Sequence, residues 1–134
     1  MNILIIDDEK DVKRLFEQRF RREIKSGEVQ LFFAHTSEEA LAFLDQEDLP
    51  DLKMILSDIN IPSINGLDLL QLIRPKFPEI TIYMITAYGN EEYKAKAKAY
   101  GADEYYTKPI NFRALKDQLM KLELAASSAL EDTN

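Results

Sequence analysis

Short apolar runs alternate with amphipathic segments from one end of the chain to the other. The runs at 3–6, 29–34, 54–56, 80–85 and 104–107 are short and rich in β-branched or aromatic residues, which is typical of strands. Over 11–25, after Thr36, between Gly66 and Pro75, over 91–100 and after Asn111, apolar residues recur three or four positions apart. This spacing places them on one helical face, so the pattern predicts five strands, each followed by a helix.

Residues that cap or break helices stand at the expected boundaries. Thr36 begins a capping-box sequence, and Asn90 and Asn111 are placed to cap the helices that follow them. Pro75 should end a helix, because it has no N–H to donate and clashes with the preceding turn. Gly101 stands where a glycine commonly follows a helix. The boundaries therefore agree with the alternation of strands and helices.

The alternation also predicts the fold class and the domain organisation. Strands that alternate with helices predict an α/β fold with a parallel, doubly wound sheet, covered by helices on both faces. A chain of 134 residues suits one domain, which we place at residues 1–124. The small, polar and acidic segment 125–134 is expected to be a flexible tail.

Charged and hydroxyl side chains stand where four of the five predicted strands end. Asp7 and Asp8 follow the first strand, Asp58 follows the third, Thr86 ends the fourth and Lys108 follows the fifth. In an open parallel sheet, ligands bind beyond the carboxyl ends of the strands. Each residue alone has a plainer explanation, such as an Asp that caps the next helix. Their coincidence at four strand ends favours one shared site.

The charges of this predicted site favour a divalent cation. Three carboxylates and one ammonium leave two surplus negative charges, and carboxylates this close raise one another's pKa. Oxygen ligands with several retained waters suit Mg²⁺. A carboxylate beside Mg²⁺ can also attack phosphorus and form an aspartyl phosphate, whose oxygens the cation and Lys108 would neutralise.

Composition removes several other classes of protein. The chain has no Cys and a single His, His35, which excludes disulfides, thiol nucleophiles and multi-histidine metal centres. A net charge of −7 argues against binding nucleic acid or an anionic membrane through this domain. No apolar run approaches the roughly 20 residues of a membrane-spanning helix, and no signal peptide is apparent. We therefore expect a cytoplasmic protein.

Five motifs occur in order over about residues 2–124. They are Ile3-Leu4-Ile5-Ile6-Asp7-Asp8-Glu9, Met54-Ile55-Leu56-Ser57-Asp58-Ile59-Asn60-Ile61-Pro62, Asn65-Gly66, Ile85-Thr86-Ala87 and Gly101-Ala102-Asp103-Glu104-Tyr105-Tyr106-Thr107-Lys108-Pro109. Together they resemble the response-regulator receiver family of two-component signalling, which includes chemotaxis regulators. The resemblance implies a flavodoxin-like (βα)5 fold with strand order 2-1-3-4-5. Ser63 departs from the family, which often has Gly there.

The resemblance also implies a role for each residue of the site. Asp58 would accept the phosphoryl group and contact the Mg²⁺ ion. Asp8 would bind the metal directly, Asp7 through water, and Asn60 through its backbone carbonyl. Thr86 and Lys108 would bind the phosphoryl group, and Tyr105 would be the switch aromatic. Tyr88 stands where the family tunes dephosphorylation, and the bond between Lys108 and Pro109 would be cis.

These roles predict a signalling switch that catalyses only its own phosphorylation and dephosphorylation. A sensor histidine kinase or a phosphotransfer protein would supply the phosphoryl group. A downstream protein, or a second copy of the chain, would bind the face made by helix 91–100, strand 104–107 and the last helix.

Two alternatives stay open. One is an unphosphorylated interaction module of the same fold. The other is an aspartate-nucleophile Mg²⁺ phosphohydrolase of the haloacid-dehalogenase type. That class needs a second Asp two residues after the nucleophile, where this chain has Asn60.

Overall fold

The computed structural model describes residues 1–87 and 89–132, so Tyr88 and residues 133–134 lie outside the described residues. The strands are β1 (Asn2–Ile6), β2 (Gln30–Ala34), β3 (Leu52–Asp58), β4 (Thr81–Thr86) and β5 (Glu104–Thr107). The helices are α1 (Lys10–Arg19), α2 (Arg21–Ser26), α3 (Ser37–Leu44), α4 (Gly66–Ile73), α5 (Glu91–Ala99) and α6 (Phe112–Asp132).

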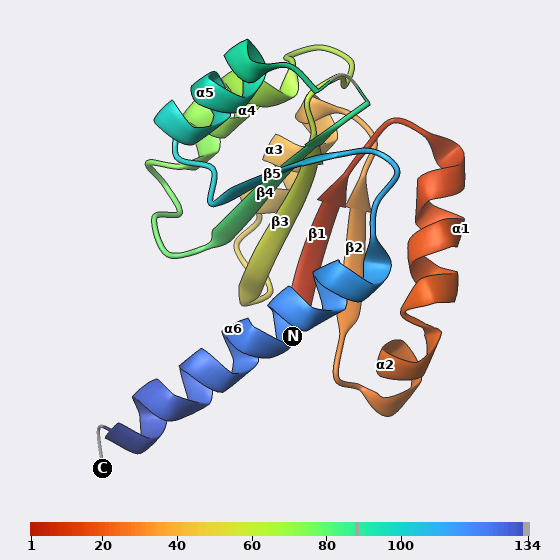
Figure 1. The fold of residues 1–134 in the computed structure, drawn as a ribbon, viewed down its shortest axis with the longest axis vertical. Helices are drawn as coiled ribbons and strands as arrows, with labels where there is room; N and C mark the ends of the chain where they lie inside the picture. Colours follow the sequence, from red (N-terminus) through yellow and green to blue (C-terminus); the bar gives the residue numbers. More distant parts are fainter. Residues whose placement is uncertain (88, 133–134) are drawn as a thin grey trace.

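The strands form one parallel sheet in the order β2-β1-β3-β4-β5, which confirms the predicted fold class and strand order. The helices α3, α4 and α5 cover one face of the sheet, and α1 and α6 cover the other, with the short α2 following α1 on that side (Figure 1). Each face carries its own core because side chains alternate between the two faces of a strand. Ile55 and Met84 belong to the first core, and Leu56 and Ile85 belong to the second.

The caps that the sequence predicted are present. The side chains of Thr36, Asn90 and Asn111 each accept a hydrogen bond from the backbone N–H three residues on, at 2.7–3.1 Å. Asn65 caps α4 in the same way, at 3.0 Å. Glu39 departs from a capping box, because its carboxylate accepts from the backbone N–H of His35 and not from Thr36.

The helix predicted over 11–25 is divided in two at Phe20. Phe20 leaves the helical conformation, with φ −103° and ψ 15°. Its buried ring stacks on that of Phe16 at 6.0 Å and meets that of Phe112 edge to face at 6.2 Å. An unbroken helix would have placed Ile24 on the same buried face as Phe20. The break turns α2 away, and the side chain of Ile24 is 38% exposed.

Arg74 joins the end of α4 to the loop that enters β5. Its guanidinium donates to the backbone carbonyls of Gly101, Phe77, Pro78 and Ile80 and to the carboxylate of Asp103, at 2.8–3.2 Å. The helix α4 ends at Ile73, ahead of Pro75 as predicted. Its C-cap residue, Arg74, connects the end of the helix to the loop before β5.

The last helix, α6, continues through Asp132 and extends past the sheet (Figure 1). Residues 125–132, which the sequence indicated to be a flexible tail, have helical backbone in the structure. The division of the chain into a domain over 1–124 and a flexible tail over 125–134 stays a prediction. No helix in the described part of the chain is both long and apolar enough to span a membrane.

Candidate functional site

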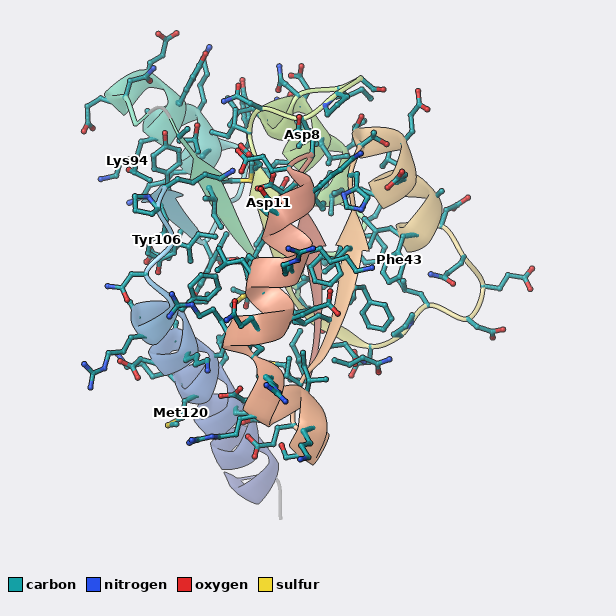
Figure 2. The ribbon with its side chains drawn as sticks, turned by 90° about the vertical axis from the view of Figure 1, so that its right-hand side faces the viewer. Asp8, Asp11, Phe43, Lys94, Tyr106 and Met120 are labelled. Atoms are coloured by element: carbon teal, nitrogen blue, oxygen red, sulfur yellow. The ribbon has the colours of Figure 1, made fainter. Side chains whose placement is uncertain are left out.

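The carboxyl edge of the sheet gathers the residues that the sequence placed at strand ends. Asp7 follows β1, Asp58 ends β3, Thr86 ends β4 and Lys108 follows β5. The side chains of Asp7, Asp58 and Thr86 are buried, whereas Asp8 is exposed. Figure 2 shows Asp8 above the N-terminal end of α1, at the same end of the molecule. Buried charges at this edge require partners.

Lys108 supplies the partner for two of these carboxylates. Its Nζ donates to Oδ2 of Asp7 and to Oδ2 of Asp58, at 2.9 Å each, and to Oε1 of Glu9 at 3.4 Å. The backbone N–H of Lys108 donates to the carbonyl of Thr86 at 2.7 Å. The Lys108–Pro109 bond is cis, as the resemblance implied. One ammonium thus joins the ends of β1 and β3 to β5.

The environment shifts the pKa of both members of this ion pair. Burial raises the pKa of Asp58 above its ordinary range, although the hydrogen bonds from Lys108 and Asn60 oppose that shift. Burial lowers the pKa of Lys108, but the hydrogen bonds to Asp58 and Asp7 outweigh it and leave that pKa raised. Lys108 is therefore a cation at neutral pH, and Asp58 ionises less readily than an exposed aspartate.

Three carboxylates at this edge could hold a cation. Asp7, Asp8 and Asp58 each offer one oxygen, and these oxygens lie within 4.8 Å of one another. Lys108 alone leaves negative charge uncompensated, since Glu9 also lies against it. A hard divalent cation with oxygen ligands fits this donor set, because it would relieve the repulsion that Asp7 exerts on Asp58.

Neither Asp7 nor Asp8 caps the following helix, so the plainer explanation of these residues is wrong. The N-cap of α1 is Glu9, and its side chain makes no capping hydrogen bond. Asp7 instead accepts from the backbone N–H of Glu9 at 2.9 Å while its other oxygen accepts from Lys108. Both oxygens of Asp7 are therefore used to shape the site.

The loop after β3 is held in place from α3. The backbone N–H of Asn60 donates to Oδ1 of Asp58 at 3.0 Å. Buried Ser37 donates from its hydroxyl to the carbonyl of Pro62 at 3.1 Å and accepts from the backbone N–H of Ile64 at 2.8 Å. The loop that carries Asn60 is therefore fixed at both ends. Ser63 within it adopts a positive φ of 74°, which explains why glycine suits this position.

Gly66 allows the loop to pass close to the end of β3. Its backbone N–H donates to the carbonyl of Ile59 at 2.6 Å. A Cβ atom at this position would collide with the backbone carbonyl of Asp58. The Asn65-Gly66 motif thus has two functions, since Asn65 caps α4 and Gly66 lets α4 begin against Asp58.

The two predicted switch residues lie on neighbouring strands. Thr86 is wholly buried at the end of β4. Tyr105, on β5, is half-buried, pairs in register with Met84 and packs against the first core. Burial raises the pKa of the Tyr105 hydroxyl, with a hydrogen bond from Asn90 opposing it. Tyr105 is therefore partly covered where it lies on β5.

Two residues of the site were not predicted. Glu9 was part of a recognised motif, but no role had been given to it. Ser37 was hidden inside a capping sequence, because its partners Pro62 and Ile64 are more than 20 positions away along the chain. Only the packing of α3 against the loop brings them together.

A model of the response regulator receiver domain family matches residues 3–120. The chain is 34% identical over 116 residues to the response regulator protein PilR of Pseudomonas aeruginosa, covering 85% of this chain and 24% of that protein. It is 32% identical over 121 residues to the chemotaxis protein CheY1 of Helicobacter pylori, covering 89% of this chain and 94% of that protein. The chain therefore spans about a quarter of PilR but nearly all of CheY1.

Solved structures agree with the fold. A CheY-like response regulator receiver domain protein from Methanospirillum hungatei superimposes with a TM-score of 0.80 at 28% identity, over 95% of this chain and 97% of that one. A BeF3-activated receiver domain of DrrB gives a TM-score of 0.75 at 22% identity, over 90% of this chain and 95% of that one. At 22% identity, the similarity to the DrrB receiver domain shows the fold alone.

Proposed function

The chain belongs to the response regulator receiver domain family, and from this premise we propose that Asp58 accepts a phosphoryl group within a two-component phosphorelay. The observation that carries the proposal is the convergence of buried Asp58, Asp7 and Lys108 at 2.9 Å contacts on one edge of the sheet. Asp58 ends the central strand β3, and an incoming phosphoryl group would find Thr86 at the end of the neighbouring strand β4 and Lys108 just after β5.

The chemistry is a transfer from a phosphohistidine to a carboxylate. A carboxylate oxygen of Asp58 forms a bond to phosphorus while the bond between phosphorus and the donor nitrogen breaks. The imidazole keeps the electron pair of that bond and leaves as neutral histidine, because its other nitrogen already carries a proton. Lys108 moves from the Asp58 carboxylate to a phosphoryl oxygen, and Thr86 donates a hydrogen bond to another. In this proposal the domain catalyses only its own phosphorylation and dephosphorylation.

We propose Mg²⁺ as the cation of the site. Asp7, Asp8, Asp58 and the backbone carbonyl of Asn60 would hold it, with water between the ion and Asp7. When bound, the ion supplies neutralising charge for the phosphoryl oxygens. The carboxylate cluster supports this proposal, because its charge exceeds what Lys108 compensates.

The switch acts on a face made by α5, β5 and α6. Thr86 moves toward the phosphoryl group, and Tyr105 then swings into the space that Thr86 leaves. Tyr93, Lys94 and Lys98 complete this face, which suits a protein partner better than DNA. The partners are a sensor histidine kinase or phosphotransfer protein, and a downstream protein or a second phosphorylated copy. A cytoplasmic location goes with these partners.

The two alternatives have less support. An aspartate-nucleophile phosphohydrolase needs a carboxylic acid where Asn60 stands, and an amide cannot transfer that proton. Burying Asp7, Asp58 and Lys108 costs desolvation free energy, which apolar residues at these positions would avoid. A module that is never phosphorylated would gain nothing from these three buried charges.

The first prediction tests Asp58 as the acceptor. The chain is incubated with acetyl phosphate and Mg²⁺, and intact mass spectrometry measures the incorporated phosphate. We expect one phosphate in the native chain and none in Asp58→Asn, because the amide is not a nucleophile toward phosphorus. Excess chelator should suppress incorporation in the native chain.

Asp51→Asn is the matched control, because Asp51 is an exposed aspartate that immediately precedes β3, at the end opposite Asp58. It should incorporate one phosphate as the native chain does. Incorporation that persists in Asp58→Asn would assign the acceptor elsewhere. Incorporation that is equally fast in chelator would remove Mg²⁺ from the proposal.

A further inference from the structure

The helices far from Asp58 enclose a hollow of about 490 Å³ between the end of α1, α2 and α6. Figure 2 shows α1 and α2 beside α6 on this side of the molecule. Its charged lining residues are Arg19, Arg21, Arg22, Lys25, Lys116 and Glu23. We call this hollow the basic groove. It gathers five of the 17 Lys and Arg residues and only one of the 24 acidic residues, in a chain whose net charge is −7.

The break between α1 and α2 explains why cations collect here. Phe20 is anchored in the second core, so its neighbours Arg19, Arg21 and Arg22 are turned to the surface. Lys116 is held by Glu23 at 2.8 Å and lies 5.1 Å from the centre of the Phe20 ring. Arg21 and Arg22 make no hydrogen bond or ion pair with any residue that the structure describes.

Exposed apolar side chains lie on the same three helices. Four large apolar side chains are exposed in the described part of the chain, and three of them lie on these helices: Leu15, Ile24 and Met120, at 37%, 38% and 62%. An adjoining hollow of about 160 Å³ shares Glu23 and Lys116 with the groove. Its other lining residues are apolar, apart from Glu28 and Glu123, and include Phe20, Leu119 and Met120. It has room for one apolar side chain.

We propose that the basic groove binds an acidic, amphipathic segment of a partner protein. Carboxylates of that segment lie against Arg21, Arg22 and Lys25, and one apolar side chain enters the hollow beside Met120. Exposed Arg and Met next to an apolar pocket are typical of protein interfaces. The binding is electrostatically steered, so it weakens as the salt concentration rises.

The other polyanions fit this surface less well. A nucleic acid extends past five cations onto a chain that is otherwise strongly acidic. A bilayer is flat and cannot enter a concave groove with one small apolar hollow. A small molecule needs a more enclosed pocket than one whose arginines are exposed.

The groove is also separate from the phosphorylation site. Asp7 precedes the N-terminal end of α1, and the groove lies past its C-terminal end, so the ten residues of α1 set them about 15 Å apart. Binding at the basic groove can therefore be tested separately from phosphorylation of Asp58.

A peptide titration tests the inference. The probe is a fluorescein-labelled synthetic helical peptide with Glu along one face and a single Leu beside it, and fluorescence anisotropy measures its binding. We expect saturable binding that is lost when Gln replaces each Glu of the peptide. The double variant Arg21→Glu/Arg22→Glu should bind roughly tenfold more weakly, because two attractive contacts become repulsive.

The matched control is Lys53→Glu/Lys76→Glu, which changes the net charge equally at exposed positions that line neither the basic groove nor the Asp58 site. It should bind the peptide as the native chain does, and both double variants should accept phosphate from acetyl phosphate at the native rate. Three outcomes would overturn the inference. They are no saturable binding of the Glu peptide, an equal loss in both double variants, and tighter binding of duplex DNA or phosphatidylserine vesicles than of the peptide.

Discussion

At the residue scale, the close approach of Gly66 to Asp58 makes a strong prediction. A Cβ at Gly66 would overlap the backbone carbonyl of Asp58, so Gly66→Ala must displace either α4 or the end of β3. We expect the free energy of unfolding to fall by about 2–3 kcal/mol, as for other overpacked sites. Phosphorylation by acetyl phosphate should also slow. Urea denaturation and intact mass spectrometry measure the two effects.

Gly27→Ala is the matched control for that variant. Gly27 has a positive φ of 84° but nothing within 4 Å of the position a Cβ would take. Its replacement should therefore cost only the backbone strain, about 1 kcal/mol, and leave phosphorylation unchanged. Equal effects of the two variants on phosphorylation would show that Gly66 has no special relation to Asp58.

Single residues also show how far the sequence could predict the site. Asp7, Asp58 and Lys108 were predictable because parallel strands bring their carboxyl ends to one edge, and each residue stands at such an end. The contacts of Glu9 and Ser37 were not. Glu9 reaches Lys108 across 99 positions, and Ser37 reaches Pro62 across 25. Such pairs depend on how the helices pack, which no local pattern records.

At the element scale, the hydrogen bonds of Arg74 predict how far the stability of the protein depends on the connection between α4 and the loop before β5. The guanidinium makes five hydrogen bonds from the end of α4 and is only 18% exposed. Arg74→Ala leaves the carbonyls of Gly101, Phe77 and Ile80 without that donor. We expect a loss of about 3 kcal/mol in the free energy of unfolding, measured by urea denaturation.

Arg113→Ala is the control for Arg74, because Arg113 is an exposed arginine on α6. It should change stability by less than about 0.5 kcal/mol. Arg74→Lys should recover only part of the loss, since one ammonium cannot donate in all the directions of a guanidinium. Full recovery by Lys would mean that charge alone, and not the shared hydrogen bonding, holds the loop.

Some helices and strands were predicted from the sequence more accurately than others. The strands and the caps at Thr36, Asn90 and Asn111 were correct because each depends on a few neighbouring residues. The division of the first helix at Phe20 was not predicted. Its cause is the packing of the Phe20 ring against Phe112, a residue on the last helix of the chain.

At the scale of the whole molecule, the raised pKa of Asp58 predicts how stability depends on pH. The folded protein binds the Asp58 proton more tightly than the unfolded chain does. Its contribution to stability is therefore full below the ordinary value near 3.8 and is lost as pH rises through the raised pKa. Lys108 keeps its contribution until pH passes 10.5, so it does not change within this window.

Without metal, Asp58→Asn should therefore gain stability relative to the native chain as the pH rises above 3.8 and through the raised pKa of Asp58. Adding Mg²⁺ at neutral pH should make the native chain more stable than Asp58→Asn. At a metal concentration about 100 times the Kd, binding stabilises the native chain by about 2.7 kcal/mol, and the variant gains less. Urea denaturation in chelator and in Mg²⁺ measures both effects. A stability difference that is independent of both pH and Mg²⁺ would contradict the buried-carboxylate account.

The length of α6 has a mechanical consequence. Its first residue, Phe112, stands four positions after Lys108, and the helix runs for 21 residues in all, with its far part extending past the sheet (Figure 1). A straight helix of that length is a stiff rod of about 31 Å, so a tilt of about 5° at its base carries the far end through roughly 3 Å. A small change in the direction of α6 near Lys108 therefore produces a larger displacement of its far end, and the displacement is greatest at Asp132.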